Sequence, residues 1–288
     1  MKPTLLVQTV FISLVVASPY HEQISHPLTE NTDIAYLHRS SKLLQKFLQP
    51  NHSTNIPANL DVGNKNSKSK TELSKNWAGA VLDAPQNSAF SYISATLTVP
   101  KPSAIGSSDY QAASAWVGID GLDVPTALLQ TGININIING EPSYNAWYQW
   151  YPSPSVNFDI PIHKGDVIVA TVNVTSPSAG ICQIENHTTK QIESKNLTAP
   201  DATATLAGRN AEWIVEDFKA DGRRVDFVDF GQLEFHGCTA ITGGDRVGNY
   251  RTYGLGDRPT IYELVRDEEV VTDVHVISPD TLGVVYKN

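Results

Sequence analysis

Three common hydrolase signatures are absent from the sequence. It contains no Gly-x-Ser-x-Gly nucleophile elbow, no His-Glu-x-x-His zinc helix and no Asp-Thr/Ser-Gly pair of the kind that pepsin-like aspartic peptidases use. Four histidines lie singly among predicted loops and strands, and we interpret them as structural or exposed: His163, His187, His236 and His275. We therefore predict no metal site and no cofactor, which leaves carboxylates and amides to carry any catalytic chemistry.

Basic residues are outnumbered, with 21 Lys and Arg against 30 Asp and Glu. The resulting pI near 5.3 argues against nucleic acid as a partner, because nucleic-acid binders are usually basic. The imbalance is uneven along the chain. Residues 1–70 carry 7 basic and 4 acidic side chains, whereas residues 71–288 carry 14 and 26. The chain therefore has two parts of different character.

Hydrophobic runs long enough to cross a membrane are absent as well. Lys2 precedes an apolar run from Thr4 to Ala17, which is typical of a secretory signal peptide and too short for a spanning helix. Val15 and Ala17 fit cleavage before Ser18. We therefore predict a signal peptide over residues 1–17 and a secreted, extracellular protein that does not bind a membrane.

Glycosylation sites and cysteines agree with secretion. Chance supplies some Asn-x-Ser/Thr sequons in a Ser/Thr-rich chain, and this chain has four of them, at Asn51, Asn173, Asn186 and Asn196. Cys182 and Cys238 are the only two cysteines. In an oxidising compartment they most simply form one disulfide, and the alternative is two buried free thiols.

Residues 18–72 differ in character from the remainder of the chain. The stretch "AYLHRSSKLLQKFLQ" (35–49) places its apolar side chains on one face at helical spacing, and the stretch after it is polar, basic and without periodicity. A basic helical segment before an acidic domain suggests a propeptide that acts as an inhibitor of the domain it precedes. The alternative is an N-terminal extension without a role.

From Asn76 onward the chain reads as strands and turns. Alternating or β-branched segments are separated by Gly, Pro, Asn and Ser, with no convincing amphipathic helix and no internal repeat. The ambiguous stretch 260–278 is interpreted as two strands around an Asp/Glu turn. So many antiparallel strands predict an all-β sandwich of two packed sheets, formed by a single monomeric domain over residues 73–288.

The stretch "LLQTGININI" (128–137) has an unusual polar face. Apolar side chains occupy alternate positions, and between them stand Gln130, Gly132, Asn134 and Asn136, none of which is charged. Other strands show similar faces, with Trp, Asn, Gln and Glu at alternate positions: "SAWVGID", "YNAWYQWY" and "AEWIVEDF". If these faces join, they line a groove for an extended peptide or sugar. The alternative is cross-strand aromatic pairs and surface amides.

Five blocks carry a family resemblance: "NWAGAVL" (76–82), "SAWVGIDG" (114–121), "LLQTG" (128–132), "YNAWYQWYP" (144–152) and "NAEWIVEDF" (210–218). In order and spacing they resemble the glutamic peptidases, or eqolisins, fungal acid endopeptidases of the scytalidoglutamic and aspergilloglutamic type. The resemblance covers roughly residues 74 to 288.

The resemblance implies two packed, curved, antiparallel sheets of the concanavalin or lectin-like kind, and catalysis without a metal. It implies that the catalytic pair is Gln130 and Glu216. It places Trp116, Asp120 and Trp147 at substrate-binding positions of the cleft, together with Gln149. Some family members have Glu where this chain has Gln149, so the pH profile of this chain is expected to differ from theirs.

These residue types suit peptide hydrolysis in acid. An imidazole of pKa about 6.5 is almost fully protonated at pH 3–4, so histidine cannot serve as the base. A carboxylate remains partly ionised there, and Glu216 could take a proton from water and return it to the leaving amine. The amide of Gln130 could donate to the oxyanion at any pH. We therefore expect an acid endopeptidase that is insensitive to pepstatin.

Two other functions remain open from the residues alone. A lectin-like sandwich would use the same groove to bind carbohydrate without hydrolysing it. A glycosidase would use two carboxylates, for which Glu212 and Glu216 are candidates. Their alpha carbons, four residues apart on a strand, would be about 13 Å apart. That is long compared with the roughly 5–9.5 Å between glycosidase carboxyl groups.

Overall fold

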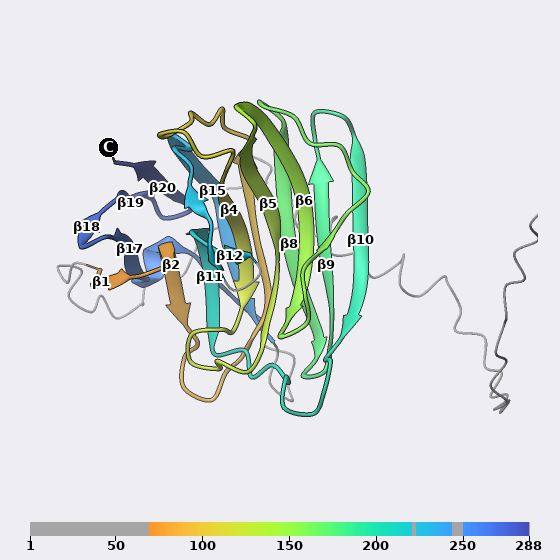
Figure 1. The fold of residues 1–288 in the computed structure, drawn as a ribbon. Helices are drawn as coiled ribbons and strands as arrows, with labels where there is room; N and C mark the ends of the chain where they lie inside the picture. The colour runs from red at the N-terminus through yellow and green to blue at the C-terminus, as the bar shows by residue number, and fades with distance from the viewer. Residues whose placement is uncertain (1–68, 221–222, 244–249, 288) are drawn as a thin grey trace, which may run out of the picture. The chain divides into compact units, whose positions relative to one another are not determined.

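The computed structural model describes residues 69–220, 223–243 and 250–287. The predicted signal peptide, nearly all of the predicted propeptide and the sequon at Asn51 lie outside these residues. Within them the fold is all-β, with two sheets packed face to face as a sandwich (Figure 1). The predicted fold class is confirmed.

The first sheet contains ten strands in the order β1-β17-β2-β11-β4-β5-β6-β7, with β14 beside β4 and β18 beside β17. Its pairings are antiparallel except for β1 with β17 and β14 with β4, which are parallel. The strands are β1 (Thr71–Ser74), β2 (Trp77–Asp83), β4 (Tyr110–Ile119), β5 (Leu128–Ile138), β6 (Glu141–Tyr151), β7 (Val156–Asn157), β11 (Asn210–Glu216), β14 (Asp226–Phe227), β17 (Thr260–Arg266) and β18 (Glu269–Val270).

The second sheet contains eight strands in the order β10-β9-β8-β3-β15-β20-β19, with β16 beside β15. Its strands are β3 (Phe90–Thr98), β8 (Val167–Ser176), β9 (Ala179–Asn186), β10 (Gln191–Thr198), β15 (Gln232–Thr242), β16 (Arg251–Tyr253), β19 (Thr272–Ser278) and β20 (Thr281–Tyr286). A short hairpin of β12 (Lys219–Ala220) and β13 (Arg223–Arg224) and one 3-10 turn, η1 (Leu255–Asp257), complete the described elements.

The core lies between the sheets and matches the period-two pattern of the sequence. On β5 the odd positions Leu129, Ile133 and Ile135 are fully buried against the second sheet. Trp213 on β11 is also fully buried, and its indole nitrogen donates to the carbonyl of Ser94 on β3 at 3.1 Å. Each such side chain contributes roughly 1.5–3 kcal/mol by leaving water. Because these side chains face the second sheet, the alternate positions of β5 and β11 face away from the core.

The opposite face of the first sheet carries a second, smaller apolar cluster, made of Val81, Trp116, Leu128, Trp147, Ile214 and Tyr262. Two glycines make room for it. A Cβ on Gly132 would lie 2.6 Å from Cα of Trp116, and a Cβ on Gly118 would lie 2.9 Å from the side chains of Trp116 and Leu128. The glycine in the "LLQTG" block is therefore needed for close packing of the tryptophan beside it.

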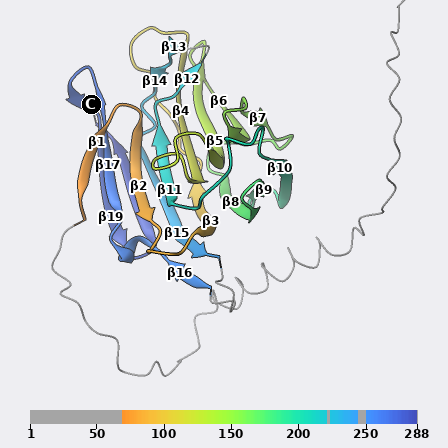
Figure 2. The same ribbon diagram turned by 90° about the horizontal axis from the view of Figure 1, so that it is seen from below.

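The ambiguous stretch 260–278 forms strands on both sides of an acidic turn, as predicted. β17 and β18 both belong to the first sheet and are joined by the turn at Asp267 and Glu268, whereas β19 belongs to the second sheet, so the chain crosses between the sheets at Val271. Figure 2 shows these strands at the end of the sandwich that also holds β1. The hairpin of β9 and β10 was not among the strands predicted from the sequence.

The predicted Cys182–Cys238 disulfide is wrong. Both cysteines are free and buried, on β9 and β15 respectively. Two strands, β8 and β3, lie between β9 and β15. Three strand spacings amount to roughly 14 Å, whereas bridged cysteines have alpha carbons about 4.4–6.8 Å apart. The alternative of two buried free thiols is the correct one.

The sequons differ in accessibility. Asn196 is exposed and Asn173 is half-buried, whereas Asn186 is fully buried. The side-chain nitrogen of Asn186, which would carry a glycan, donates to the carboxylate of Asp166 at 2.8 Å. Its side-chain oxygen accepts from the backbone of Thr188 and Thr189. The predicted glycosylation at Asn186 is therefore incompatible with this fold.

Candidate active site

The candidate residues come from adjacent strands of the first sheet, on the face turned away from the core. The order β11-β4-β5-β6 places these strands side by side (Figure 1). Gln130 on β5 is paired in register with Gln149 on β6. Glu216, the last residue of β11, is paired with Ser114 on β4, which is paired in turn with Asn134 on β5.

A cavity of about 460 Å³ opens on this face. Gln130, Gln149, Trp147 and Glu216 all line it. The other residues of its wall are Asn76, Trp77, Ser114, Gly121, Pro125, Leu128, Asn134, Tyr151, Ser155, Phe218 and Lys219. The expected catalytic amide and carboxylate thus face one cavity, although they lie far apart in the chain.

Each oxygen of the Glu216 carboxylate accepts one hydrogen bond. The indole nitrogen of Trp116 donates to Oε2 at 2.9 Å, and the side-chain amide of Asn76 donates to Oε1 at 3.2 Å. Burial raises the pKa of Glu216 above its ordinary value, while the hydrogen bonds from Asn76 and Trp116 lower it. Burial prevails, so Glu216 is a stronger base when ionised than an exposed glutamate is.

The amide of Gln130 is held from the neighbouring strand. Its Nε2 donates to Oε1 of Gln149 at 2.7 Å, and Nε2 of Gln149 donates to the backbone carbonyl of Ser153 at 2.7 Å. The Gln130 side chain is nearly buried, and its Oε1 has no hydrogen-bond partner within the described part of the chain. A buried amide oxygen without a partner costs free energy, which other contacts of the fold must offset.

Two tryptophans shape the floor of the cavity. Trp116 is fully buried and packs edge-to-face on Trp77, with ring centroids 5.3 Å apart. Trp147 donates from its indole nitrogen to the hydroxyl of Ser114 at 3.1 Å. Of the two predicted substrate-binding tryptophans, Trp147 lines the cavity and Trp116 lies beneath it, where it contacts Glu216 instead.

The predicted cleft residue Asp120 does not line the cavity. Its φ of 66° breaks the strand alternation that would have aimed its side chain along the face of Trp116. The side chain is fully buried, and its carboxylate accepts from the backbone nitrogens of Ala207, Gly208 and Arg209 at 2.6–2.9 Å. It therefore holds the segment that leads into β11.

Asp217, next to Glu216, fixes the other side of the β11 end. Its buried carboxylate accepts from Nε of Arg224 at 2.8 Å and from Arg266 at 3.2 Å. Consecutive residues of a strand point to opposite faces. The pair of arginines therefore holds Asp217 on one side while Glu216 faces the cavity on the other.

The second carboxylate of this strand, Glu212, is not part of the cavity wall. It is fully buried, and neither carboxyl oxygen has a hydrogen-bond partner among the residues described. Burial, and secondarily the charge of Asp120, raise the pKa of Glu212 well above its ordinary value. The glycosidase-like pair of Glu212 and Glu216, which the sequence left open as an alternative, is therefore not formed, because Glu212 does not line the cavity where a substrate would lie.

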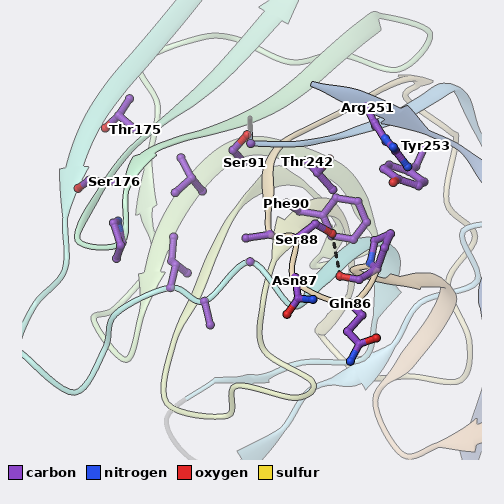
Figure 3. A pocket seen from close by; sticks show the side chains of 18 residues that line it. Gln86, Asn87, Ser88, Phe90, Ser91, Thr175, Ser176, Thr242, Arg251 and Tyr253 are labelled. Atoms are coloured by element: carbon purple, nitrogen blue, oxygen red, sulfur yellow. Dashed lines mark hydrogen bonds between the residues drawn. The ribbon is translucent and has the colours of Figure 1, made fainter. Parts of the chain in front are cut away.

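A larger cavity of about 670 Å³ lies elsewhere on this domain (Figure 3). It is bounded by the turns around Asn87, Ser176 and Ala207 and by β16, which contributes Arg251 and Tyr253. Its lining includes no carboxylate or histidine among the described residues, so it offers no general base. Within the same residues no group of three or more His, Cys, Asp or Glu could hold a metal ion, and no helix is long and apolar enough to span a membrane.

Three residues of the site were not predicted as functional: Asn76, Ser114 and Ser153. Asn76 and Ser114 stand in the "NWAGAVL" and "SAWVGIDG" blocks, so their sequence context marked them. Ser153 acts through its backbone carbonyl, which no side-chain pattern reveals.

Known proteins resemble this chain in both sequence and structure. The model of the Peptidase A4 family matches residues 75–286. Aspergillopepsin-2 of Aspergillus niger is 38% identical over 239 residues, which are 77% of this chain and 80% of that protein. Scytalidopepsin B of Scytalidium lignicola is 37% identical over 73% of this chain and 77% of its own length. A crystal structure of scytalido-glutamic peptidase with a peptide-based transition state analog superposes with a TM-score of 0.63, at 36% identity, over 74% of this chain and 98% of that one.

Proposed function

This chain belongs to the peptidase A4 family, the glutamic peptidases, and we propose how it hydrolyses peptide bonds and where it acts. The proposal is that it is a secreted acid endopeptidase with Glu216 as general base and Gln130 as oxyanion donor. The observation that carries the proposal is that both side chains line one cavity, from strands β5 and β11 of the same sheet, with only β4 between them.

In the first step ionised Glu216 takes a proton from a water molecule, whose oxygen attacks the carbonyl carbon of the scissile peptide bond. The carbonyl π electrons move to oxygen and form a tetrahedral oxyanion. Nε2 of Gln130 donates one hydrogen to Gln149 and keeps a second for this oxyanion. An amide does not titrate, so this donor is available at the acid pH where the enzyme would work.

In the second step the intermediate collapses. The carbon–nitrogen bond breaks, and protonated Glu216 gives its proton to the leaving amine, which restores the carboxylate. The hydrogen bonds from Asn76 and Trp116 stabilise the ionised form between turnovers. The raised pKa of Glu216 makes the ionised carboxylate a stronger base, while the fraction of enzyme that holds it ionised falls as the pH drops below that pKa.

The cavity supports a peptide substrate by its shape and lining. A peptide transition state analog is bound in the related scytalido-glutamic peptidase. Trp147 offers an aromatic wall, and Asn134 offers an amide that can pair with a peptide backbone. We propose Trp147 as a residue that binds substrate and Trp116 as one that positions Glu216.

The part of the predicted propeptide that precedes β1, residues 18–70, is proposed to inhibit the precursor until acid releases it. This segment carries 6 basic and 4 acidic side chains, whereas residues 71–288 carry 14 and 26, an acidic excess that weakens as carboxylates are protonated. The signal peptide over residues 1–17 and glycans on Asn173 and Asn196 belong to the same proposal of a secreted monomer.

The experiment is hydrolysis of an acid-denatured protein at pH 3–4, with and without pepstatin and with and without a metal chelator. We expect internal cleavage of the substrate that neither agent reduces. Inhibition by either agent, or binding of the substrate without cleavage by the mature chain, would contradict the proposed mechanism.

A further inference from the structure

The orientation of the Gln130 amide is not set by Gln130 itself. The two ends of a glutamine amide have nearly the same shape, and only the hydrogen-bond partners decide which end is nitrogen. In this chain the partners form a series that starts from a backbone carbonyl. The carbonyl of Ser153 can only accept a hydrogen bond, so the group of Gln149 that faces it at 2.7 Å must be the nitrogen.

The rest of the series depends on that first bond. Because the nitrogen of Gln149 faces Ser153, its oxygen faces Gln130. The group of Gln130 that contacts this oxygen at 2.7 Å must be a donor, and it is therefore Nε2. Ser153 is itself held by a turn, because its backbone nitrogen donates to the carbonyl of Trp150 at 2.9 Å. The β5–β6 pairing brings Gln130 and Gln149 directly opposite each other. The amide of Gln130 thus has one orientation, fixed by groups that do not titrate.

We infer that Gln149 is a positioning residue, which sets the Gln130 amide so that the second Nε2 hydrogen is presented to the reaction. This inference rests on the proposed function. It replaces the expectation that Gln149 binds substrate. Its oxygen is committed to Gln130 and its nitrogen to Ser153, so its main polar contacts are already made within the protein.

A glutamate at this position would behave differently with pH. A protonated carboxyl group can donate to the Ser153 carbonyl and accept from Gln130, as the amide does. An ionised one has no proton to donate and turns an acceptor toward the Ser153 carbonyl. It would also place a negative charge beside the developing oxyanion. The glutamine of this chain therefore keeps the site assembled over a wider pH range.

Few charged groups line this cavity within the described part of the chain. They are Glu216 on β11 and Lys219 on β12, with the titratable Tyr151 on β6, whereas the polar side chains from β5 are the amides of Gln130 and Asn134. From the loop that precedes β5, Gly121 and Pro125 line the cavity, and neither titrates. The titration of a glutamate introduced at residue 149 would therefore be seen beside that of one other carboxylate in the described cavity wall, Glu216.

The test uses two variants of the mature enzyme, Gln149→Glu and Gln149→Met, with kcat and KM measured from pH 2.5 to 6.5. We expect the ratio of kcat for Gln149→Glu to that of the parent to be near one at the acid end. The ratio should fall at least about tenfold with rising pH, along a one-proton curve near the pKa of about 4.3 of an ordinary glutamate. Gln149→Met, which has similar volume and no amide, should lose about tenfold or more in kcat at every pH, with KM little changed.

Other results would overturn the inference. A raised KM at parental kcat in Gln149→Met would make Gln149 a substrate-binding residue. A Gln149→Glu ratio that does not vary with pH would show that the orientation of Gln130 is set elsewhere. Thermal unfolding of both variants identifies loss of fold, and a variant that unfolds is replaced by Gln149→Asn under the same criteria. Parental activity in these variants, with Glu216→Gln inactive, would refute the positioning role and leave the proposed function intact.

Discussion

The side-chain amide of Asn76 lies 3.2 Å from Oε1 of Glu216 and donates a hydrogen bond to it across 140 positions of sequence. Asn76 precedes β2, the strand that pairs with β11 on the side opposite β4. The carboxylate is therefore held from both neighbouring strands, by Asn76 on one side and by Trp116 on the other.

This hydrogen bond gives the first prediction. Because the bond from Asn76 lowers the pKa of Glu216, its removal in Asn76→Ala should raise that pKa further. A base with a higher pKa is ionised only at higher pH, so the acid limb of the kcat/KM profile should move to higher pH. Asn76→Asp, which replaces the donor with a negative charge, should move it further in the same direction. An acid limb that stays in place in both variants would contradict the assignment of Glu216 as the base.

The second prediction concerns maturation. β1 pairs with β17 from Thr71 to Ser74, and Asn76 contacts Glu216, so both belong to the folded enzyme. After incubation of the precursor at pH 3–4, N-terminal sequencing of the active form should give a start at or before Thr71. An engineered chain that starts at Trp77 should be much less active than one that starts at Lys70. Equal activity of the two chains would refute this boundary.

The third prediction concerns stability at high pH. The pKa of Glu212 is raised in the folded chain, so the folded state holds a proton that the unfolded state loses above about pH 4.3. The contribution of protonated Glu212 to the free energy of unfolding is fully present below that pH. It decreases by about 1.4 kcal/mol per pH unit as the pH rises from there toward the pKa of the folded state. Denaturant unfolding at pH 4 and pH 7 should show a smaller loss for Glu212→Gln than for the parent.

Glu212→Gln also serves as the matched control for Glu216. It lies on the same strand, is fully buried and does not line the cavity, so its activity at pH 4 should stay close to parental. If the free energy of unfolding fell equally between pH 4 and pH 7 in the parent and in Glu212→Gln, Glu212 would not be the cause of that loss.

The fourth prediction concerns the cysteines. Burial raises the pKa of both thiols, and each lies in the core on a separate strand. Alkylation should leave Cys182 and Cys238 unmodified in the native enzyme and modify both after denaturation without a reductant. Reducing agents should not change the free energy of unfolding. A peptide that contains both cysteines joined would contradict the structure.

The sequence was sufficient for the parts of the fold that depend on local pattern. Period-two alternation predicted β5 and its buried face, because Leu129, Ile133 and Ile135 repeat at strand spacing. It failed at Asp120, where a left-handed backbone conformation ends the alternation and turns the side chain inward. Aspartate before glycine is compatible with a left-handed conformation, but the alternating pattern does not show which residue adopts it.

Long-range relationships set the other limit. The disulfide prediction assumed that two cysteines in an oxidising compartment meet, whereas strand order places β8 and β3 between them. The resemblance identified Gln130 and Glu216 from their blocks, but their supporting contacts depend on pairings such as Asn76 with Glu216. A backbone acceptor such as Ser153 can be found only in three dimensions.

The catalytic pair is the fifth prediction and the central claim. Gln130→Ala should reduce kcat by about 10²–10³, as expected for loss of a side-chain oxyanion donor. Gln130→Glu should be at least as damaging above its pKa, because an ionised carboxylate repels the oxyanion. Circular dichroism and thermal unfolding should show a parental fold in both variants.

The most direct measurement is the turnover of an acid-denatured protein by mature Glu216→Gln, with Glu212→Gln prepared alongside. The substitution keeps the shape of the side chain and its contact with Trp116 while it removes the base. We predict turnover at background for Glu216→Gln across pH 2.5–6.5, with a parental unfolding transition, and near-parental turnover for Glu212→Gln at pH 4. Near-parental hydrolysis by folded Glu216→Gln, or a larger loss in Glu212→Gln, would contradict the account.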